Sequence, residues 1–156
     1  MNDPASRPGV PFPPPLPFVL AFGLGWLLQR WRPLGLFGAA AITEGAGWTL
    51  LVLGLLLMFV GMGTFLRAGT AVIPFRAASR LVTWGPYRFT RNPMYTGFTI
   101  AYLGGVLLMN SAWPLLFLPV ALAVLTRLVI VREERHLGAL FGEEYAAYRR
   151  RVRRWI

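Results

Sequence analysis

Two short segments of this chain carry side chains that could bind a charged small molecule or move a proton. Residues 85–97 contain arginines and tyrosines around a Gly-Pro and an Asn-Pro pair, and residues 133–148 begin with two adjacent glutamates and end with two tyrosines. Arginine binds carboxylates through paired hydrogen bonds, glutamate accepts hydrogen bonds or takes up a proton, and a tyrosine ring attracts a cation. Both segments are therefore candidate parts of a ligand site.

Missing residue types exclude several common chemistries. The chain has no cysteine and no lysine, which excludes disulfides, thiolate metal sites, cysteine nucleophiles, P-loop lysines and Schiff-base lysines. The single histidine, His136, argues against a histidine metal site. The single aspartate, Asp3, lies in a proline-rich segment, which argues against a Ser-His-Asp triad. We expect no bound metal.

The composition indicates an integral membrane protein. Hydrophobic residues make up 56% and charged residues 14% of the 156 residues. A soluble core of this size cannot bury so many apolar side chains, whereas a bilayer solvates them and helices satisfy the backbone internally. The net charge of +10 comes from 16 arginines that flank apolar stretches, a pattern that fits membrane topology better than nucleic-acid binding. We expect contact with membrane lipids and none with nucleic acid.

The predicted fold is all-α: one domain, residues 1–156, that forms a polytopic membrane helical bundle with a cytoplasmic amphipathic C-terminal helix. About four membrane segments are predicted, at residues 17–31, 46–66, 93–109 and 114–131. Outside them we expect a proline-rich lead-in at 1–15, a cytoplasmic loop at 67–92 and cytoplasmic helices at 132–156 that close over this loop. The first membrane segment is short for a span, so tilting of its neighbours must absorb the difference.

Arginine positions predict the orientation of the bundle. Arg30 and Arg32 lie on one side of the predicted membrane segments, and Arg127 lies within the fourth. The other arginines lie in the N-terminal segment, the 67–92 loop and the tail, on the opposite side. The positive-inside rule places both termini in the cytoplasm, and we expect a prokaryotic cytoplasmic membrane. A turn near Asn110 makes the third and fourth segments antiparallel, which brings the two candidate segments to the same end.

The order and spacing of the motifs resemble a known family of membrane methyltransferases, which includes isoprenylcysteine carboxyl methyltransferase and phospholipid N-methyltransferases. The matching residues are Gly85-Pro86-Tyr87-Arg88, Arg91-Asn92-Pro93-x-Tyr95-x-Gly97 and Glu133-Glu134-x-x-Leu137-x-x-x-Phe141-Gly142-x-x-Tyr145-x-x-Tyr148. The resemblance covers roughly residues 65–156. Many members have histidine where this chain has Asn92.

The resemblance implies S-adenosylmethionine as the methyl donor and a lipophilic acceptor that enters from the bilayer. The implied catalytic residues are Arg91, Glu133 and Glu134. The implied cofactor-binding residues are Tyr87, Arg88, Asn92, Pro93, Tyr95, Gly97, Glu134, Phe141, Tyr145 and Tyr148. Either glutamate could accept both ribose hydroxyls, the arginines or the helix start at Asn92-Pro93 could bind the cofactor carboxylate, and the tyrosines could pack on the adenine or sulfonium. An ammonium acceptor must lose a proton, whereas a carboxylate acceptor needs no base.

Each of these residues also has a structural interpretation. The glutamates could pair with neighbouring arginines, Gly97 could permit close helix packing, and Tyr145 and Tyr148 could form an interfacial aromatic stripe. At the level of function, an NADPH-dependent sterol or steroid reductase and a non-enzymatic membrane scaffold are the alternatives to methyl transfer. The absence of charges within the spans, apart from Arg127, disfavours a transporter.

Overall fold

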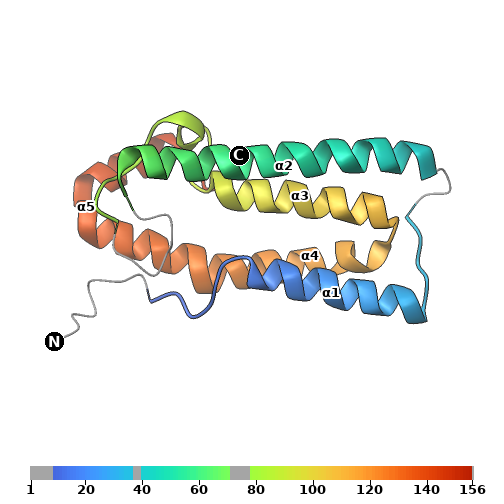
Figure 1. The fold of residues 1–156 in the computed structure, drawn as a ribbon. Helices are drawn as coiled ribbons and strands as arrows, with labels where there is room; N and C mark the ends of the chain where they lie inside the picture. Colours follow the sequence, from blue (N-terminus) through green and yellow to red (C-terminus); the bar gives the residue numbers. More distant parts are fainter. Residues whose placement is uncertain (1–8, 37–39, 71–77, 156) are drawn as a thin grey trace.

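All elements of the described chain are helices. The computed structural model describes residues 9–36, 40–70 and 78–155. The elements are α1 (Leu16–Trp31), α2 (Ala40–Ala68), the 3₁₀ turn η2 (Gly85–Arg88), α3 (Pro93–Met109), α4 (Ala112–Leu125), the π-helical turn η3 (Thr126–Ile130) and α5 (Val131–Arg151). Parts of the predicted lead-in and loop, residues 1–8 and 71–77, lie outside the described residues. Figure 1 shows α2 beside α3 and α1 beside α4, with α5 at one end of the bundle.

The four predicted membrane segments all fall on helices. Helix α3 has the bounds of the third predicted segment, and α1 begins one residue before the first. Helix α2 begins before its predicted segment and ends two residues after it. The fourth segment covers most of α4 and all of η3, and the helix then continues without interruption into α5.

Two helical segments are long and apolar enough to cross a membrane: Ile42–Ala68 within α2, and the run Ala112–Arg151, whose backbone breaks at Gly142 beyond its apolar part. Large apolar side chains on α2 face outward, with Val52, Leu56 and Phe59 each about half exposed. A soluble protein would bury such a helix, whereas lipid solvates it directly. The 16 residues of α1 and the 17 of α3 make shorter apolar helices.

Glycines allow α2 and α3 to approach until their backbones touch. A Cβ atom at Gly97 would lie 2.6 Å from the Gly54 carbonyl oxygen, and one at Gly104 would lie 2.5 Å from the Leu51 nitrogen. Small residues at such contacts let membrane helices gain close van der Waals packing. Gly97 therefore has the packing role that the sequence left open as an alternative to cofactor binding.

The opposite end of the bundle is closed by hydrogen bonds between α1 and the α3–α4 turn. Asn110 adopts the left-handed conformation, and the Ser111 hydroxyl accepts a hydrogen bond from the Trp113 nitrogen at 3.3 Å as the N-cap of α4. The same hydroxyl donates to Gln29 Oε1 at 2.8 Å, and Trp113 Nε1 donates to the Arg32 carbonyl at 2.7 Å. These bonds fix the antiparallel arrangement of α3 and α4 that the sequence predicts.

Substitution of Gly54 by alanine tests the α2–α3 contact. The added methyl group would collide with the backbone of Ala101 and lie 2.6 Å from the Gly97 oxygen. We expect Gly54→Ala to destabilise the protein by about 1–3 kcal/mol, the usual cost of overpacking. Gly63→Ala is the matched control, because a Cβ at Gly63 meets nothing within 4 Å. Thermal unfolding in detergent measures both, and equal melting temperatures would contradict the role of this contact.

Candidate functional site

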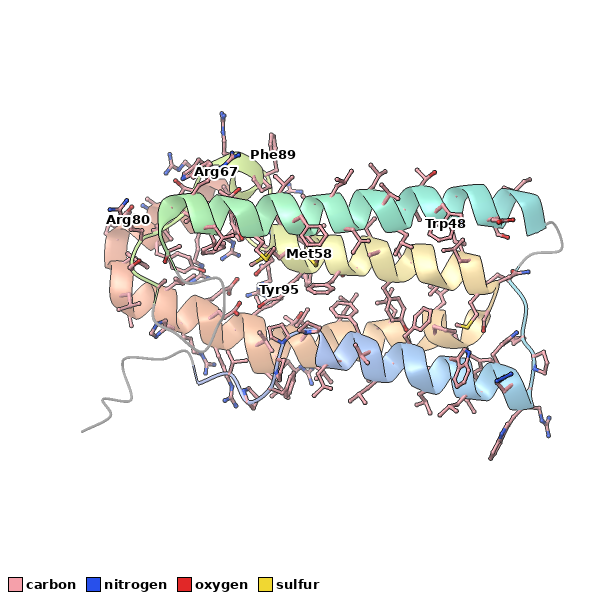
Figure 2. The ribbon with its side chains drawn as sticks, viewed as in Figure 1. Trp48, Met58, Arg67, Arg80, Phe89 and Tyr95 are labelled. Carbon is pink, nitrogen blue, oxygen red and sulfur yellow. The ribbon has the colours of Figure 1, made fainter. Side chains whose placement is uncertain are left out.

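The two segments singled out in the sequence meet at the end of the bundle where α3 begins. Pro93 occupies the first turn of α3, and the antiparallel course of α4 into α5 brings residue 133 opposite that turn. The Tyr95 hydroxyl donates a hydrogen bond to Glu133 Oε1 at 2.7 Å. Figure 2 shows Tyr95 between α3 and the helix that continues from α4 into α5. This contact joins the first segment to the second.

A carboxylate held by two arginines forms the charged centre of the site. Arg91 Nη1 lies 3.0 Å from Glu134 Oε1. Arg154 donates from Nε to Oε1 at 2.9 Å and from Nη2 to Oε2 at 2.7 Å. The side chains of Arg91 and Glu134 are each 10% exposed, and that of Arg154 is 34% exposed. Both oxygens proposed for the ribose hydroxyls thus have arginine partners, the pairing that the sequence left open.

Hydrogen bonds hold the C-terminal residues against the loop that precedes α3. The Arg91 nitrogen donates to the Arg153 carbonyl at 2.9 Å. The Arg154 carbonyl accepts from the Thr90 hydroxyl at 3.1 Å and from Asn92 Nδ2 at 2.9 Å. Asn92 is the N-cap residue of α3, but its side-chain amide binds the tail and makes no cap hydrogen bond. Arg153 and Arg154 of the tail therefore lie against the last residues of this loop.

Buried tyrosines fill the space between the loop, α2 and the tail. The Tyr148 hydroxyl donates to the Tyr87 carbonyl at 2.8 Å, and the Tyr87 ring packs edge-on against Phe65. Tyr145 and Tyr148 form one buried cluster, to which Phe141 adds a partly buried ring. The backbone of Gly142 (φ 47°, ψ −121°) interrupts α5, and the buried Tyr145 and Tyr148 follow this break.

Several buried polar atoms in the described part of the site have no hydrogen-bond partner. They are the Tyr87 hydroxyl, the Thr96 hydroxyl and Arg91 Nε, while Arg91 Nη1 has only its charge contact with Glu134. A buried donor without a partner is costly, so in native folds such donors are usually satisfied by ordered water, an ion or a ligand. These atoms give the site free hydrogen-bonding capacity for a polar ligand.

The two adjacent glutamates have different partners, and burial changes the acid strength of Glu133. Burial raises the pKa of Glu133 to about 7, the charge of Glu134 adds to this increase, and the hydrogen bond from Tyr95 opposes it. Glu133 lies past the apolar part of its helix, in the charged stretch that begins at Arg132. Burial also raises the pKa of Tyr87, with Tyr148 and Glu133 adding to it, so that this hydroxyl keeps its proton and can donate it in a hydrogen bond.

An apolar groove of about 470 Å³ lies between α1 and α3. Its walls include Phe18, Phe22 and Trp26 from α1, together with Phe98 and Tyr102 from α3. Phe98 and Tyr102 follow Tyr95 at helical spacing, and all three belong to the same core cluster. The groove therefore leads along α3 towards the contact between Tyr95 and Glu133.

The structure does not bring every predicted residue into the site. Arg88 is exposed and Gly97 faces α2, whereas Pro93 is fully buried at the start of α3. Sequence reasoning missed Thr90, Thr96 and Arg154. Thr96 lies inside the quoted motif and could have been considered there. The tail arginine carries no local signal, because its partner Glu134 is 20 residues away.

Comparison with known proteins gives consistent matches. A family model described as phospholipid methyltransferase matches residues 42–144. Protein-S-isoprenylcysteine O-methyltransferase B of Arabidopsis thaliana is 34% identical over 109 residues, which cover 68% of this chain and 55% of the relative. The protein-S-isoprenylcysteine O-methyltransferase of Schizosaccharomyces pombe is 33% identical over 105 residues, which cover 60% of this chain and 44% of the relative.

A third relative is shorter in its match. Methanethiol S-methyltransferase 1 of Bradyrhizobium diazoefficiens is 39% identical over 66 residues, which cover 42% of this chain and 22% of the relative. The present chain spans about half the length of the two isoprenylcysteine methyltransferases. The names of these three relatives share the transfer of methyl groups and differ in the acceptor.

Loss of the Arg154 side chain tests the charged centre. We expect Arg154→Ala to lower the free energy of unfolding by about 1–2 kcal/mol. The loss is smaller than that of a fully buried charged hydrogen bond, because Arg154 is partly exposed and Arg91 still neutralises Glu134. Arg150→Ala is the control, since its pair with Glu143 is exposed on both sides and should change the stability by less than about 0.5 kcal/mol. Thermal unfolding of both variants measures their melting temperatures. Equal melting temperatures for Arg154→Ala and Arg150→Ala would contradict a stabilising role of the charged centre.

The acid strength of Glu133 predicts how stability depends on pH. Its pKa is higher in the folded protein, about 7, than the usual 4.5, so protonated Glu133 favours the folded state. This contribution is complete below pH 4.5 and is lost as the pH rises through 7. We expect the melting temperature to fall between pH 5 and 8, and Glu133→Gln to flatten that fall. Glu144→Gln, at an exposed position, should retain the wild-type slope.

Proposed function

Since the chain belongs to the phospholipid methyltransferase family, we propose that it transfers a methyl group from S-adenosylmethionine to a lipophilic acceptor in the membrane. The names of the relatives support methyl transfer and favour it over the NADPH-dependent reduction that a similar helical hairpin allows. The buried site with free donor atoms supports an enzyme rather than a scaffold. When bound, S-adenosylmethionine supplies a methyl group attached to a positively charged sulfur.

The unpartnered donors of Arg91 and Tyr87 are the observation that carries this proposal. The methyl donor bears a carboxylate, two ribose hydroxyls and an adenine, all of which accept hydrogen bonds. Arg91 Nε lies buried with no hydrogen-bond partner among the described residues, Arg91 Nη1 has only its charge contact with Glu134, and the Tyr87 hydroxyl is a further free donor. In this proposal Arg91 binds the carboxylate of the cofactor, and Tyr87, Tyr145 and Tyr148 enclose its apolar parts and its charge. The residues present therefore fit the cofactor.

Glu134 acts in this proposal first by orienting Arg91. Both oxygens of Glu134 already bind arginines. In this proposal Glu134 can accept a hydrogen bond from a ribose hydroxyl only if Arg154 gives up one of these oxygens. The tail residues that cover the loop exclude water from the site, which strengthens the remaining electrostatic contacts. Methyl transfer is an in-line displacement that depends on alignment and desolvation, and the buried segments around Tyr95 and Arg91 can provide both.

The groove between α1 and α3 supports a lipophilic acceptor. Its lining is apolar and it opens on the outer face of the bundle, so a hydrocarbon chain could lie in it with its polar end near Tyr95. We propose a four-span topology with the site at the cytoplasmic end, where the arginine-rich segments lie. Figure 2 shows Arg67, Arg80 and Phe89 at that end and Trp48 towards the other. The short helices α1 and α3 then require tilting or thinning of the bilayer.

Binding of S-adenosylhomocysteine tests the cofactor assignment. We expect the wild-type protein in nanodiscs to bind this product in isothermal titration, and Arg91→Lys to weaken binding by roughly 10- to 100-fold, because lysine lacks the planar pair of donors. Arg67→Lys is the matched control, since Arg67 is exposed at the end of α2. Absence of binding to a folded wild-type protein, or tight NADPH binding in its place, would contradict the proposal.

A further inference from the structure

We infer that Glu133, held by Tyr95, takes the proton of a protic methyl acceptor, an amine or a thiol, as that acceptor is methylated. The inference rests on the proposed methyl transfer and narrows its acceptor. The shared chemistry of the two acceptors is a nucleophilic atom that carries a dissociable hydrogen. A carboxylate acceptor has no such hydrogen and needs no base.

The hydrogen bonds distinguish Glu133 from its neighbour. Both oxygens of Glu134 face guanidinium groups, so protonation of this carboxylate would break charge-assisted hydrogen bonds. Glu133 has one hydrogen bond, from the Tyr95 hydroxyl to Oε1, and no arginine partner within the described chain. Its second oxygen, Oε2, is free in that same part of the structure. Only Glu133 can therefore accept a proton without losing a partner.

The position of Glu133 places it between the two ligands of the proposed reaction. On one side, Tyr95 continues into Phe98 and Tyr102, which line the apolar groove. On the other side lies the loop that bears Tyr87 and Arg91. A hydrocarbon chain in the groove would bring its reactive head to Glu133 from the membrane, while the methyl group would arrive from the loop. General-base catalysis requires this proximity.

The charges around Glu133 disfavour a carboxylate acceptor. The groups that face Glu133 are Tyr95 from α3, Tyr87 from η2 and Glu134 on its own helix. None of these is a cation, and Arg91 and Arg154 are already engaged by Glu134. An acceptor carboxylate would meet repulsion from the glutamates, whereas an amine or a thiol would meet a hydrogen-bond acceptor.

The step is balanced in atoms and charge. The lone pair of the acceptor nitrogen or sulfur attacks the methyl carbon, and the bond from that carbon to the sulfonium sulfur breaks with its electrons on the sulfur. The acceptor hydrogen passes as a proton to Glu133 Oε2, so the carboxylate becomes neutral while the sulfonium loses its charge. A pKa of about 7 allows Glu133 to accept this proton and to release it afterwards at neutral pH.

Three acceptors with the same alkyl chain test the inference: dodecanethiol, dodecylamine and dodecanoate. Methylated product is measured by mass spectrometry with the wild-type protein, Glu133→Gln and the exposed control Glu144→Gln in nanodiscs. We expect the thiol or the amine to react at least tenfold faster than the acid. Glu133→Gln should lower kcat for it by roughly 100-fold or more. Affinity for S-adenosylhomocysteine should change less than threefold, and Glu144→Gln should react as the wild type does.

The pH profile provides a readout that a structural role would not move. In the wild type kcat should rise with pH through about 7, where Glu133 loses its proton, and this limb should disappear in Glu133→Gln. Tyr95→Phe keeps the carboxylate but removes a hydrogen bond that lowers the pKa of Glu133, so the limb should move to higher pH. This variant keeps the test decisive should Glu133→Gln fold poorly.

Two results would overturn the inference. One is faster methylation of dodecanoate than of the thiol and the amine. The other is a Glu133→Gln protein that methylates the thiol or amine within threefold of the wild-type rate and with the same pH profile. Failure of the wild-type protein to bind S-adenosylhomocysteine would instead contradict the proposed function itself, so the two failures are distinguishable.

Discussion

The Glu134 carboxylate, bound by Arg91 and Arg154, is the interaction on which the rest of the site depends. It connects α5, the loop before α3 and the tail through one nearly buried group. A buried carboxylate is stable only while its charge is compensated, so α5, the loop and the tail must assemble together. The hydrogen bonds that the Thr90 hydroxyl, the Arg91 backbone nitrogen and the Asn92 side-chain amide donate to tail carbonyls then complete the enclosure. Charge compensation and closure of the site are thus one event.

Helix–helix contacts far from Glu134 determine where α3 and its Tyr95 lie relative to the charged centre. The glycine contact between α2 and α3 fixes the height of α3 against its neighbour, and the hydrogen bonds around Ser111 fix its turn into α4. Together they align Tyr95 with Glu133 across the bundle. Weak helix–helix attraction in lipid makes such close contacts the main source of precision. The apolar helices therefore serve as a frame for a polar site at one end.

The sequence predicted those features that depend on local chemistry. The third apolar segment was predicted to start at Pro93, where α3 begins, and the antiparallel hairpin implied that residues 85–97 and 133–148 meet. It did not predict which polar atoms pair over long separations. Asn is a common helix-capping residue, yet the amide of Asn92 binds the Arg154 carbonyl of the tail, a partner that the local sequence does not indicate. In the sequence Arg154 indicates only membrane topology, since no spacing rule links it to Glu134, 20 residues away.

The π-helical turn between α4 and α5 has a consequence for the two glutamates. A π turn accommodates one more residue than an α turn, and one residue corresponds to a rotation of about 100° around the helix. Everything after Ile130 is therefore turned relative to the membrane-facing part of the same helix. This offset selects which carboxylate meets Tyr95 and which meets the arginines. The extra residue of the five-residue π turn thus gives two adjacent glutamates different partners: Glu133 binds Tyr95, and Glu134 binds the arginines.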